Sequence, residues 1–427
     1  MRKWLLLLLL LITGSCFSQF SEAYNELKTF AQKKELVDTS RNSSRTRHYL
    51  LPLYKAFYNE QKLLKADTSF YIDNLKQSLS FTGDHASVLE LEKLYRDKPT
   101  GLTKEYLDTL TKVDGEFAYI DARKYILSKA KNNRVVMINE AHDKPAHRAF
   151  TASLLEELYQ QGFRYLAMEM LSNYRRTAIT KLDAYTGYFT SEPIAGELIR
   201  KALELGYTLV PYEDTARNHT VNQREYAQAE NLANFIKTHD TTAKILVHAG
   251  YGHIRKGASG DFIPMAAYFK IISGIEPLTI DQTKMTESDM NGFMPLVYDT
   301  WIRKHPTVSP MIALENNKPF DVLGTHLYDM YVIHPPTKYM NGRPTWVAMN
   351  GWRKETPVAP AFRSTFFVQA YYENEYAASS ELSVPADQTY IAAQNGVYYL
   401  YLRKGKYKLV FRDKAYTMLG TKDIEVL

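Results

Sequence analysis

Five short segments of the chain place carboxylate or imidazole side chains directly after apolar runs. The first, residues 134–150 (RVVMINEAHDKPAHRAF), presents Glu140 and His142 in this way. The others deliver the same kinds of side chain, in chain order Glu169, Glu213 with Asp214, His248 with His253, and Asp281. Glu and His side chains in one cleft can act as general bases toward water, or can hold a divalent ion that lowers the pKa of bound water to ~7. Both arrangements are suited to hydrolysis of an ester or amide.

Two of these carboxylates have few structural explanations. Glu140 and Glu169 adjoin strongly apolar runs, and a carboxylate buried there without a partner costs several kcal/mol. Because no Arg or Lys lies inside either strand end, we interpret them as parts of a shared site. Other members have ordinary alternatives: Asp143 and Asp214 could cap a helix or form a turn, and His248 could be a hydrogen-bonded core histidine.

The apolar runs themselves predict the strands that position these groups. They cover residues 134–139, 165–169, 208–213, 244–249 and 276–280, and they alternate with helical patterns of ten or more residues. This alternation is typical of βαβ units around a mainly parallel sheet, where ligands bind beyond the carboxyl ends of the strands. We therefore expect Glu140, His142, Glu169 and His253 to line one cleft as the primary site residues. His248, Glu213 and Asp214 rank next as candidates, and Asp281 ranks last.

The pattern of apolar and polar residues changes on either side of this unit. Residues 19–114 show helical apolar spacing, residues 115–284 carry the α/β pattern, and residues 285–427 are rich in β-branched and aromatic residues. In the last part, Asn395-Gly396 and Lys404-Gly405-Lys406 stand between alternating runs, as hairpin turns do. The predicted fold is an α/β unit with a mainly parallel sheet flanked by helices, a helical N-terminal extension and a small antiparallel β unit at the C-terminus.

Residues 1–18 have the features of a secretory signal peptide. Arg2 and Lys3 precede a leucine-rich run that is short for a membrane span, and small residues follow. Cleavage after Ser18 predicts an exported protein, periplasmic or extracellular. The alternative is a lipid anchor on Cys16, the only cysteine, although Thr13 stands where such motifs usually carry leucine.

Charge and hydropathy limit the partners. The net charge of +6 is spread along the chain, and no block of Lys and Arg with interleaved aromatics is typical of a nucleic-acid face. No later segment has the length and apolar character of a transmembrane helix. A small-molecule or peptide substrate is therefore expected rather than a nucleic acid.

Residues 139–170 (NEAHDKPAHRAFTASLLEELYQQGFRYLAMEM) and 248–254 (HAGYGHI) resemble a known superfamily. It joins the erythromycin esterase-like proteins, the ChaN-like haem-binding uptake proteins and the Tiki/TraB-like metalloproteases. Its Gly-Glu-x-His motif falls on Glu140 and His142, its second-strand Glu on Glu169, and its later histidine motif on His253. The resemblance covers about residues 115–283, and Asn139 replaces the usual glycine of the first motif.

The resemblance implies a choice between two classes of function. One is an exported hydrolase of the erythromycin esterase-like or Tiki-like type, with Glu140, His142, Glu169 and His253 as catalytic residues. A divalent metal there would be held by members of one set: Glu140, His142, Glu169, His248, His253, Glu213 and Asp214. The alternative is a ChaN-like protein that binds haem or another ligand without catalysis. Haem needs a His or Tyr ligand in an apolar pocket, and the many carboxylates argue against it.

Overall fold

The structure is a computed structural model that describes residues 20–33, 47–95, 103–174, 178–287, 294–358, 362, 364–392 and 397–427. The expected signal peptide, with Cys16 and Ser18, and the Asn395-Gly396 turn lie outside the described residues. Among the residues described, no helix combines the length and apolar character needed to cross a membrane.

A six-stranded parallel sheet forms the centre of the α/β unit, as predicted, with the strand order β4-β3-β5-β2-β6-β9. Its strands are β2 (Val135–Glu140), β3 (Phe163–Met168), β4 (Thr208–Pro211), β5 (Lys244–Gly250), β6 (Leu278–Asp281) and β9 (Met330–Tyr331). Strand β2 is buried along its whole length between β5 and β6. This double burial explains the uninterrupted apolar run that precedes Glu140.

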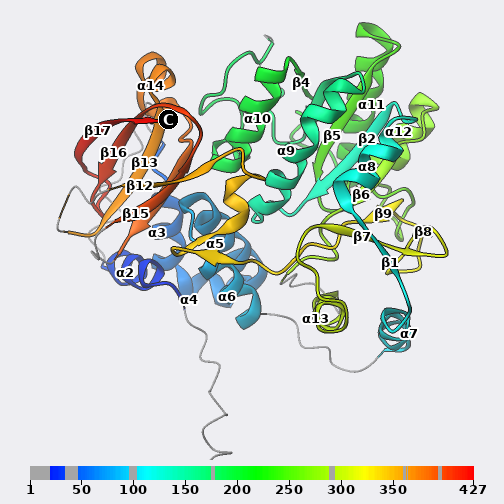
Figure 1. Ribbon diagram of the computed structural model, residues 1–427, viewed down its shortest axis with the longest axis horizontal. Helices are drawn as coiled ribbons and strands as arrows, with labels where there is room; N and C mark the ends of the chain where they lie inside the picture. The colour runs from blue at the N-terminus through cyan, green and yellow to red at the C-terminus, as the bar shows by residue number, and fades with distance from the viewer. Residues whose placement is uncertain are drawn as a thin grey trace, which may run out of the picture.

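Helices cover both faces of this sheet (Figure 1). On one face, α8 (Ala122–Ala130), α9 (Pro145–Gln160) and α10 (Pro193–Leu205) pack on alternate strand residues such as Ile138 and Leu166. On the other, α11 (Val221–His239) and α12 (Met265–Ser273) pack on the intervening residues, such as Met137 and Val247. Helix α13 (Met294–Lys304) contributes to the same core but lies away from the sheet, near α7 (Lys104–Val113) (Figure 1). Helix α9 follows β2 after a short loop and begins with Pro145, which suits a first helical position.

The N-terminal region is helical, as predicted. It contains α2 (Glu22–Ala31), α3 (Leu51–Tyr58), α4 (Glu60–Ala66), α5 (Thr68–Thr82), α6 (His85–Tyr95) and α7 (Lys104–Val113). Helices α2, α3, α5 and α6 share a core that also includes Phe367, Tyr390 and Tyr416 from the other end of the chain. The two terminal regions therefore pack together beside the α/β unit (Figure 1).

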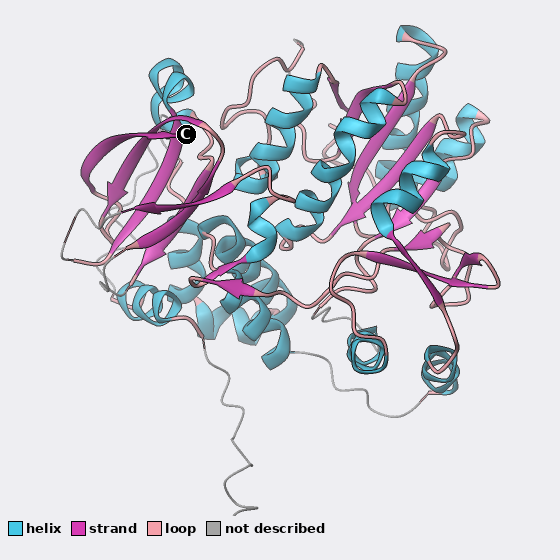
Figure 2. Cartoon of the chain, viewed as in Figure 1, coloured by secondary structure: helices cyan, strands magenta, loops and turns pink. Residues whose placement is uncertain are grey.

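The C-terminal region forms small antiparallel sheets (Figure 2). Strands β12 (Lys354–Val358) and β15 (Tyr398–Leu402) pair with each other, and β14 (Asp387–Ile391), β13 (Phe366–Tyr372), β16 (Gly405–Arg412) and β17 (Met418–Val426) form a four-stranded sheet in that order. The prediction of a hairpin turn at residues 404–406 is wrong. This segment joins β15 to β16, which lie in different sheets, because alternation of apolar residues indicates a strand but not its partner.

Two pairings connect this region to the α/β unit. Strand β9, from the segment expected to be the C-terminal unit, extends the parallel sheet beside β6. Strand β1 (Ala118–Asp121) pairs antiparallel with β7 (Met311–Glu315). Strand β7 also pairs antiparallel with β8 (Lys318–Pro319), which follows it in the chain. The remaining short elements are η2 (Phe189–Ser191), β10 (Tyr339–Met340), β11 (Arg343–Pro344), η3 (Thr345–Ala348), α14 (Glu373–Ser379) and η4 (Ser380–Leu382).

Candidate functional site

Glu140, the last residue of β2, is bound by an arginine. Arg148 of α9 donates from Nε to Oε2 and from Nη2 to Oε1 of Glu140, both at 2.7 Å. Both side chains are almost completely buried, so the expectation that no cation compensates Glu140 is wrong. Burial alone would raise the pKa of Glu140, but Arg148 holds that pKa well below its usual range. Glu140 is therefore an ionised, fixed carboxylate.

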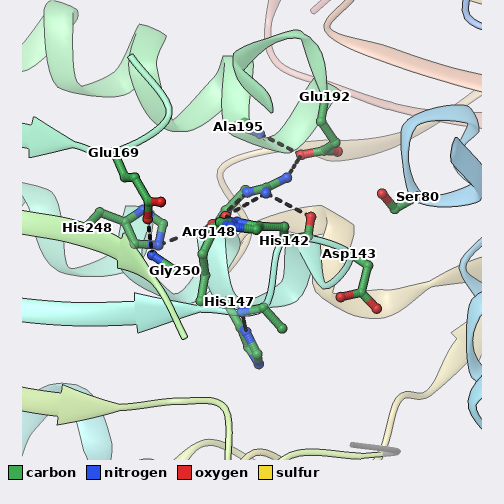
Figure 3. Close-up of polar contacts among 12 residues, drawn as sticks. Ser80, His142, Asp143, His147, Arg148, Glu169, Glu192, Ala195, His248 and Gly250 are labelled. Carbon is green, nitrogen blue, oxygen red and sulfur yellow. Dashed lines mark hydrogen bonds and ion pairs between the residues drawn. The ribbon is translucent and has the colours of Figure 1, made fainter. Parts of the chain in front are cut away.

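Arg148 also fixes the surroundings of Glu140 (Figure 3). Its Nη1 lies 3.1 Å from Oε2 of Glu192, whose carboxylate caps the start of α10 by accepting from the amides of Ile194 and Ala195. Its Nη2 donates to the carbonyl oxygen of His142 at 2.9 Å. The loop that carries His142 is thus tied to two helices and a strand end.

His142 connects this buried pair to solvent. Its Nδ1 lies 2.9 Å from Oε1 of Glu140, and its side chain is 24% exposed. The ring stacks on Phe189 at 4.4 Å between ring centroids and meets the edge of Tyr251 at 5.2 Å. Its Nε2 forms no hydrogen bond with any residue that the structure describes.

Gly250, at the end of β5, allows His142 and Glu169 to approach each other. A Cβ atom at residue 250 would lie 2.7 Å from Nε2 of His142 and 3.1 Å from Oε2 of Glu169. Both side chains therefore occupy the space that any larger residue would need. Since Gly250 also donates its amide to Oε2 of Glu169 at 2.6 Å, the strand end positions this carboxylate directly.

Glu169 is the centre of a second charged cluster. Its Oε1 accepts from Nη2 of Arg224 at 2.7 Å and lies 3.4 Å from Nε2 of His253. Arg224, on α11, also binds Glu213, and Nδ1 of His253 lies 2.6 Å from Oε1 of Glu225. Burial would lower the pKa of His253, but Glu169 and Glu225 raise it to about 10. His253 is therefore an imidazolium between two carboxylates.

The other predicted site residues differ in their surroundings. His248 is enclosed, with its Nε2 3.3 Å from Oε2 of Glu140, and burial lowers its pKa to about 4. Asp214 accepts a hydrogen bond from the amide of Ala216, two residues further on, as expected for a carboxylate that forms a turn. Its other oxygen lies 2.8 Å from Nδ1 of His219. Asp281 is buried and accepts from Asn139 and Thr283, so it ties β2 to β6 rather than facing a cleft.

Asn139 and Asp143 have structural roles that the sequence did not specify. Asn139 donates to the carbonyl of Tyr251 and accepts from the amide of Gln282, which links β2 to the loops that follow β5 and β6. Asp143 is not the cap of α9, where Lys144 occupies the N-cap position without a side-chain bond. Asp143 instead accepts from Tyr251 and pairs with Lys76 of α5.

The donor atoms do not fit a metal ion. Glu140 and Glu169 each already accept hydrogen bonds from an arginine, and both ring nitrogens of His253 lie against carboxylates. In the described part of the chain, no three His, Cys, Asp or Glu side chains are arranged to hold a metal. Haem ligation fits no better, because His248 is enclosed and both ring nitrogens of His253 lie close to charged side chains.

A cleft of about 450 Å³ opens beside these clusters. It is lined by Glu169, Glu213 and Asp214, by Phe189, on which His142 stacks, and by Arg47 of the N-terminal region. Three exposed tyrosines complete its wall: Tyr174, Tyr185 and Tyr188. Of the four residues expected to line one cleft, only Glu169 is in this lining; His142 adjoins it through the ring of Phe189.

Sequence reasoning missed the arginines of the site. Arg148 lies within the segment that presents Glu140, eight residues further on, so a search for cations on the following helix could have found it. Glu192 directly precedes Pro193, which is a recognisable helix start. Arg224 and Lys76 have no local signal, because tertiary structure alone brings them to Glu169 and Asp143.

Comparison with known proteins gives no assignment. No protein-family model matches the chain, and no curated protein does. Structures that align with it include RRSP, a MARTX toxin effector domain from Vibrio vulnificus CMCP6, at 12% identity over 64% of this chain and 65% of that one, with a TM-score of 0.29. A structure described as bacterial protein toxins aligns at 13% identity over 63% of this chain and 65% of its own, with a TM-score of 0.28.

The receptor FtsY from Elizabethkingia anophelis aligns at 9% identity over 73% of this chain and 86% of its own, with a TM-score of 0.24. The chain thus spans slightly less than two thirds of the length of the toxin structures. TM-scores this low support neither a fold assignment nor a function for this chain.

Proposed function

We propose that the protein is an exported ester or amide hydrolase of the erythromycin esterase-like type, in which His142 activates water as a general base; the metal-dependent Tiki-like type is disfavoured by the donor atoms described above. One observation carries the proposal. His142 has one ring nitrogen fixed by the ionised Glu140, while the other is without a hydrogen bond to any described residue, and its ring stacks on Phe189 of the cleft lining.

The pairing of His142 with Glu140 determines which nitrogen is the base. The carboxylate of Glu140 accepts a hydrogen bond from Nδ1–H of His142, which leaves the lone pair of the neutral ring on Nε2. Nε2 then takes a proton from water while the resulting hydroxide attacks the carbonyl carbon of the substrate. Glu140 stabilises the imidazolium that forms, and Nε2 returns the proton to the leaving alcohol or amine.

Positive charge at the same edge favours the negative charge that develops on the carbonyl oxygen. Arg224 is 38% exposed and next to Glu169, and His253 is held as an imidazolium beside it. Fixed cations aimed at a developing oxyanion lower the barrier more than they stabilise the neutral substrate. We assign Arg224 and His253 this electrostatic role, with Glu169, Glu213 and Glu225 holding them in place.

The experiment uses mature protein beginning at Gln19, a panel of aryl esters and peptides, and parallel assays with and without a metal chelator. The proposal predicts hydrolysis that survives chelation and falls by ~10²-fold or more in His142→Ala. Hydrolysis that disappears with the chelator and returns with zinc would instead support a metal-dependent site. Absence of hydrolysis together with a haem Soret shift that His253→Ala or His248→Ala abolishes would favour the non-catalytic ligand-binding alternative.

A further inference from the structure

A second cavity, of about 370 Å³, lies on the other side of the loop that carries His142. It shares no lining residue with the cleft beside Glu169. Its walls come from separate parts of the chain: the start of α6, residues 121–123, residues 143–153 with the first half of α9, residues 286–287, residues 309–310 and residues 334–350. A cavity of this size, set between separate parts of a fold, is typical of small-molecule sites.

The walls of this cavity are largely apolar and aromatic. Trp346 meets the ring of His85 at 4.6 Å, and Phe150 meets the ring of His334 edge-on at 5.4 Å. The other apolar lining residues are Val88, Leu89, Ala149, Met349 and the prolines at 310, 335 and 336. Such rings and prolines favour a flat apolar ligand, which they can contact on its faces and edges.

The charged groups of the lining already have protein partners. Asp143 pairs with Lys76 at 3.3 Å, Lys144 pairs with Glu92 at 3.3 Å, and Arg123 pairs with Glu157. Glu287 accepts from the amide of Thr337, and Asp121 accepts from the amide of Lys124. Lys338, which also lines the cavity, is exposed to solvent. The interior therefore offers little for an ionic group of a ligand.

The buried imidazoles are different. His85 is 8% exposed, and neither of its ring nitrogens has a hydrogen-bond partner within the described ranges. His334 is 7% exposed and bonds through Nε2 to Gln282 at 3.2 Å, which leaves Nδ1 as an acceptor. Burial lowers the pKa of each to about 3, so both stay neutral. A neutral imidazole without a partner is a hydrogen-bonding group available to a ligand.

We infer that this cavity binds a small uncharged molecule with a flat ring and a hydrogen-bond donor, which bonds to His85 and lies against Trp346 and Phe150. The site is separate from the proposed hydrolytic site and does not depend on it.

Three ring compounds of nearly equal size test the inference, because they differ mainly in charge: benzamide, benzoate and benzamidine. Ligand-observed NMR titration of mature protein should show saturable binding of benzamide in the millimolar range, as expected for so small a molecule. Benzoate and benzamidine should bind about ten-fold more weakly or less, since either would bring an unpaired charge into the cavity. Equal or tighter binding of either ion would overturn the claim that the ligand is uncharged.

Variants locate the binding. Ala146→Leu fills the cavity from the first turn of α9 and should weaken benzamide binding about ten-fold or more. The matched variant Ala184→Leu adds the same atoms to the cleft beside Glu169 and should leave binding unchanged. His85→Phe keeps a ring of similar shape but removes the nitrogen acceptors, so it should also weaken binding, whether or not Ala146→Leu folds. Benzamide binding that does not saturate, or that His85→Phe leaves intact, would contradict the site.

Discussion

The Nζ atom of Lys76, on the N-terminal helix α5, lies 3.3 Å from Oδ2 of Asp143, the residue directly after His142. Both side chains are buried, at 7% and 5% exposure. The other carboxylate oxygen of Asp143 accepts from the hydroxyl of Tyr251 at 3.2 Å, and the Tyr251 ring lies edge-on to His142. The helical extension is therefore coupled to the proposed catalytic loop.

Lys76→Met should destabilise the protein by about 3–5 kcal/mol, because it leaves the buried carboxylates of Asp143 and Glu92 without this cation. Urea denaturation checks the free energy of unfolding. The double variant Lys76→Met, Asp143→Asn should recover part of the lost stability, since it also removes the unpaired negative charge of Asp143. A Lys76→Met variant as stable as the wild type would show that this pair does not hold the loop.

Gly250→Ala should reduce hydrolysis by ~10²-fold, because a methyl group at residue 250 would lie 2.5 Å from Cε1 of His142 and must displace that ring. The matched control is Gly252→Ala, whose methyl would meet the flexible Arg255 side chain at 3.2 Å. It should keep near wild-type rates. Equal activity of the two variants would mean that the position of His142 does not matter.

Four buried histidines and the half-buried His48 should make the protein acid-sensitive, since burial lowers the pKa of each; the buried four are His85, His147, His248 and His334. Each of these histidines has a lower pKa in the folded protein than in the unfolded chain, where the pKa is near 6.5. The stability that the neutral ring contributes is fully present above about pH 6.5. It is lost as the pH falls toward the folded-state pKa, which is about 4 for His48. The slope is at most ~1.4 kcal/mol per pH unit for each histidine.

Unfolding measured from pH 7 to pH 4 checks this dependence. His48→Gln should flatten the slope, whereas replacing the exposed His326 by Gln should not change it. A stability that stays constant between pH 6.5 and pH 4 would contradict the neutral, buried state of these rings.

Glu140→Gln should lower the melting temperature as well as the activity. The sequence alone predicts an unchanged or higher melting temperature, as for a carboxylate near other carboxylates. Arg148 reverses that expectation, because the amide would leave a fully buried guanidinium with only Glu192 as an anionic partner. We expect a loss of about 3 kcal/mol, measured by urea denaturation, and unchanged stability would show that Arg148 does not depend on Glu140.

Local patterns were sufficient to predict five of the six strands of the central sheet and the positions of the strand-end residues, but not β9. The apolar run before Glu140 and Pro145 after it specify β2 and the start of α9, because burial and proline geometry act within a few residues. Pairings such as Lys76 with Asp143 or Arg224 with Glu169 join residues 67 and 55 positions apart, and only the folded chain brings them together. The same reason explains the wrong hairpin at residues 404–406.

The central claim is that Nε2 of His142 is the base. The most direct measurement compares kcat/KM of His142→Asn with that of His219→Asn, at a temperature where both variants are folded. His219 is a fair control because it also pairs with a carboxylate, Asp214, at 2.8 Å and is 40% exposed. We predict a loss of ~10²-fold or more for His142→Asn and about wild-type activity for His219→Asn. Wild-type activity in His142→Asn would contradict the account.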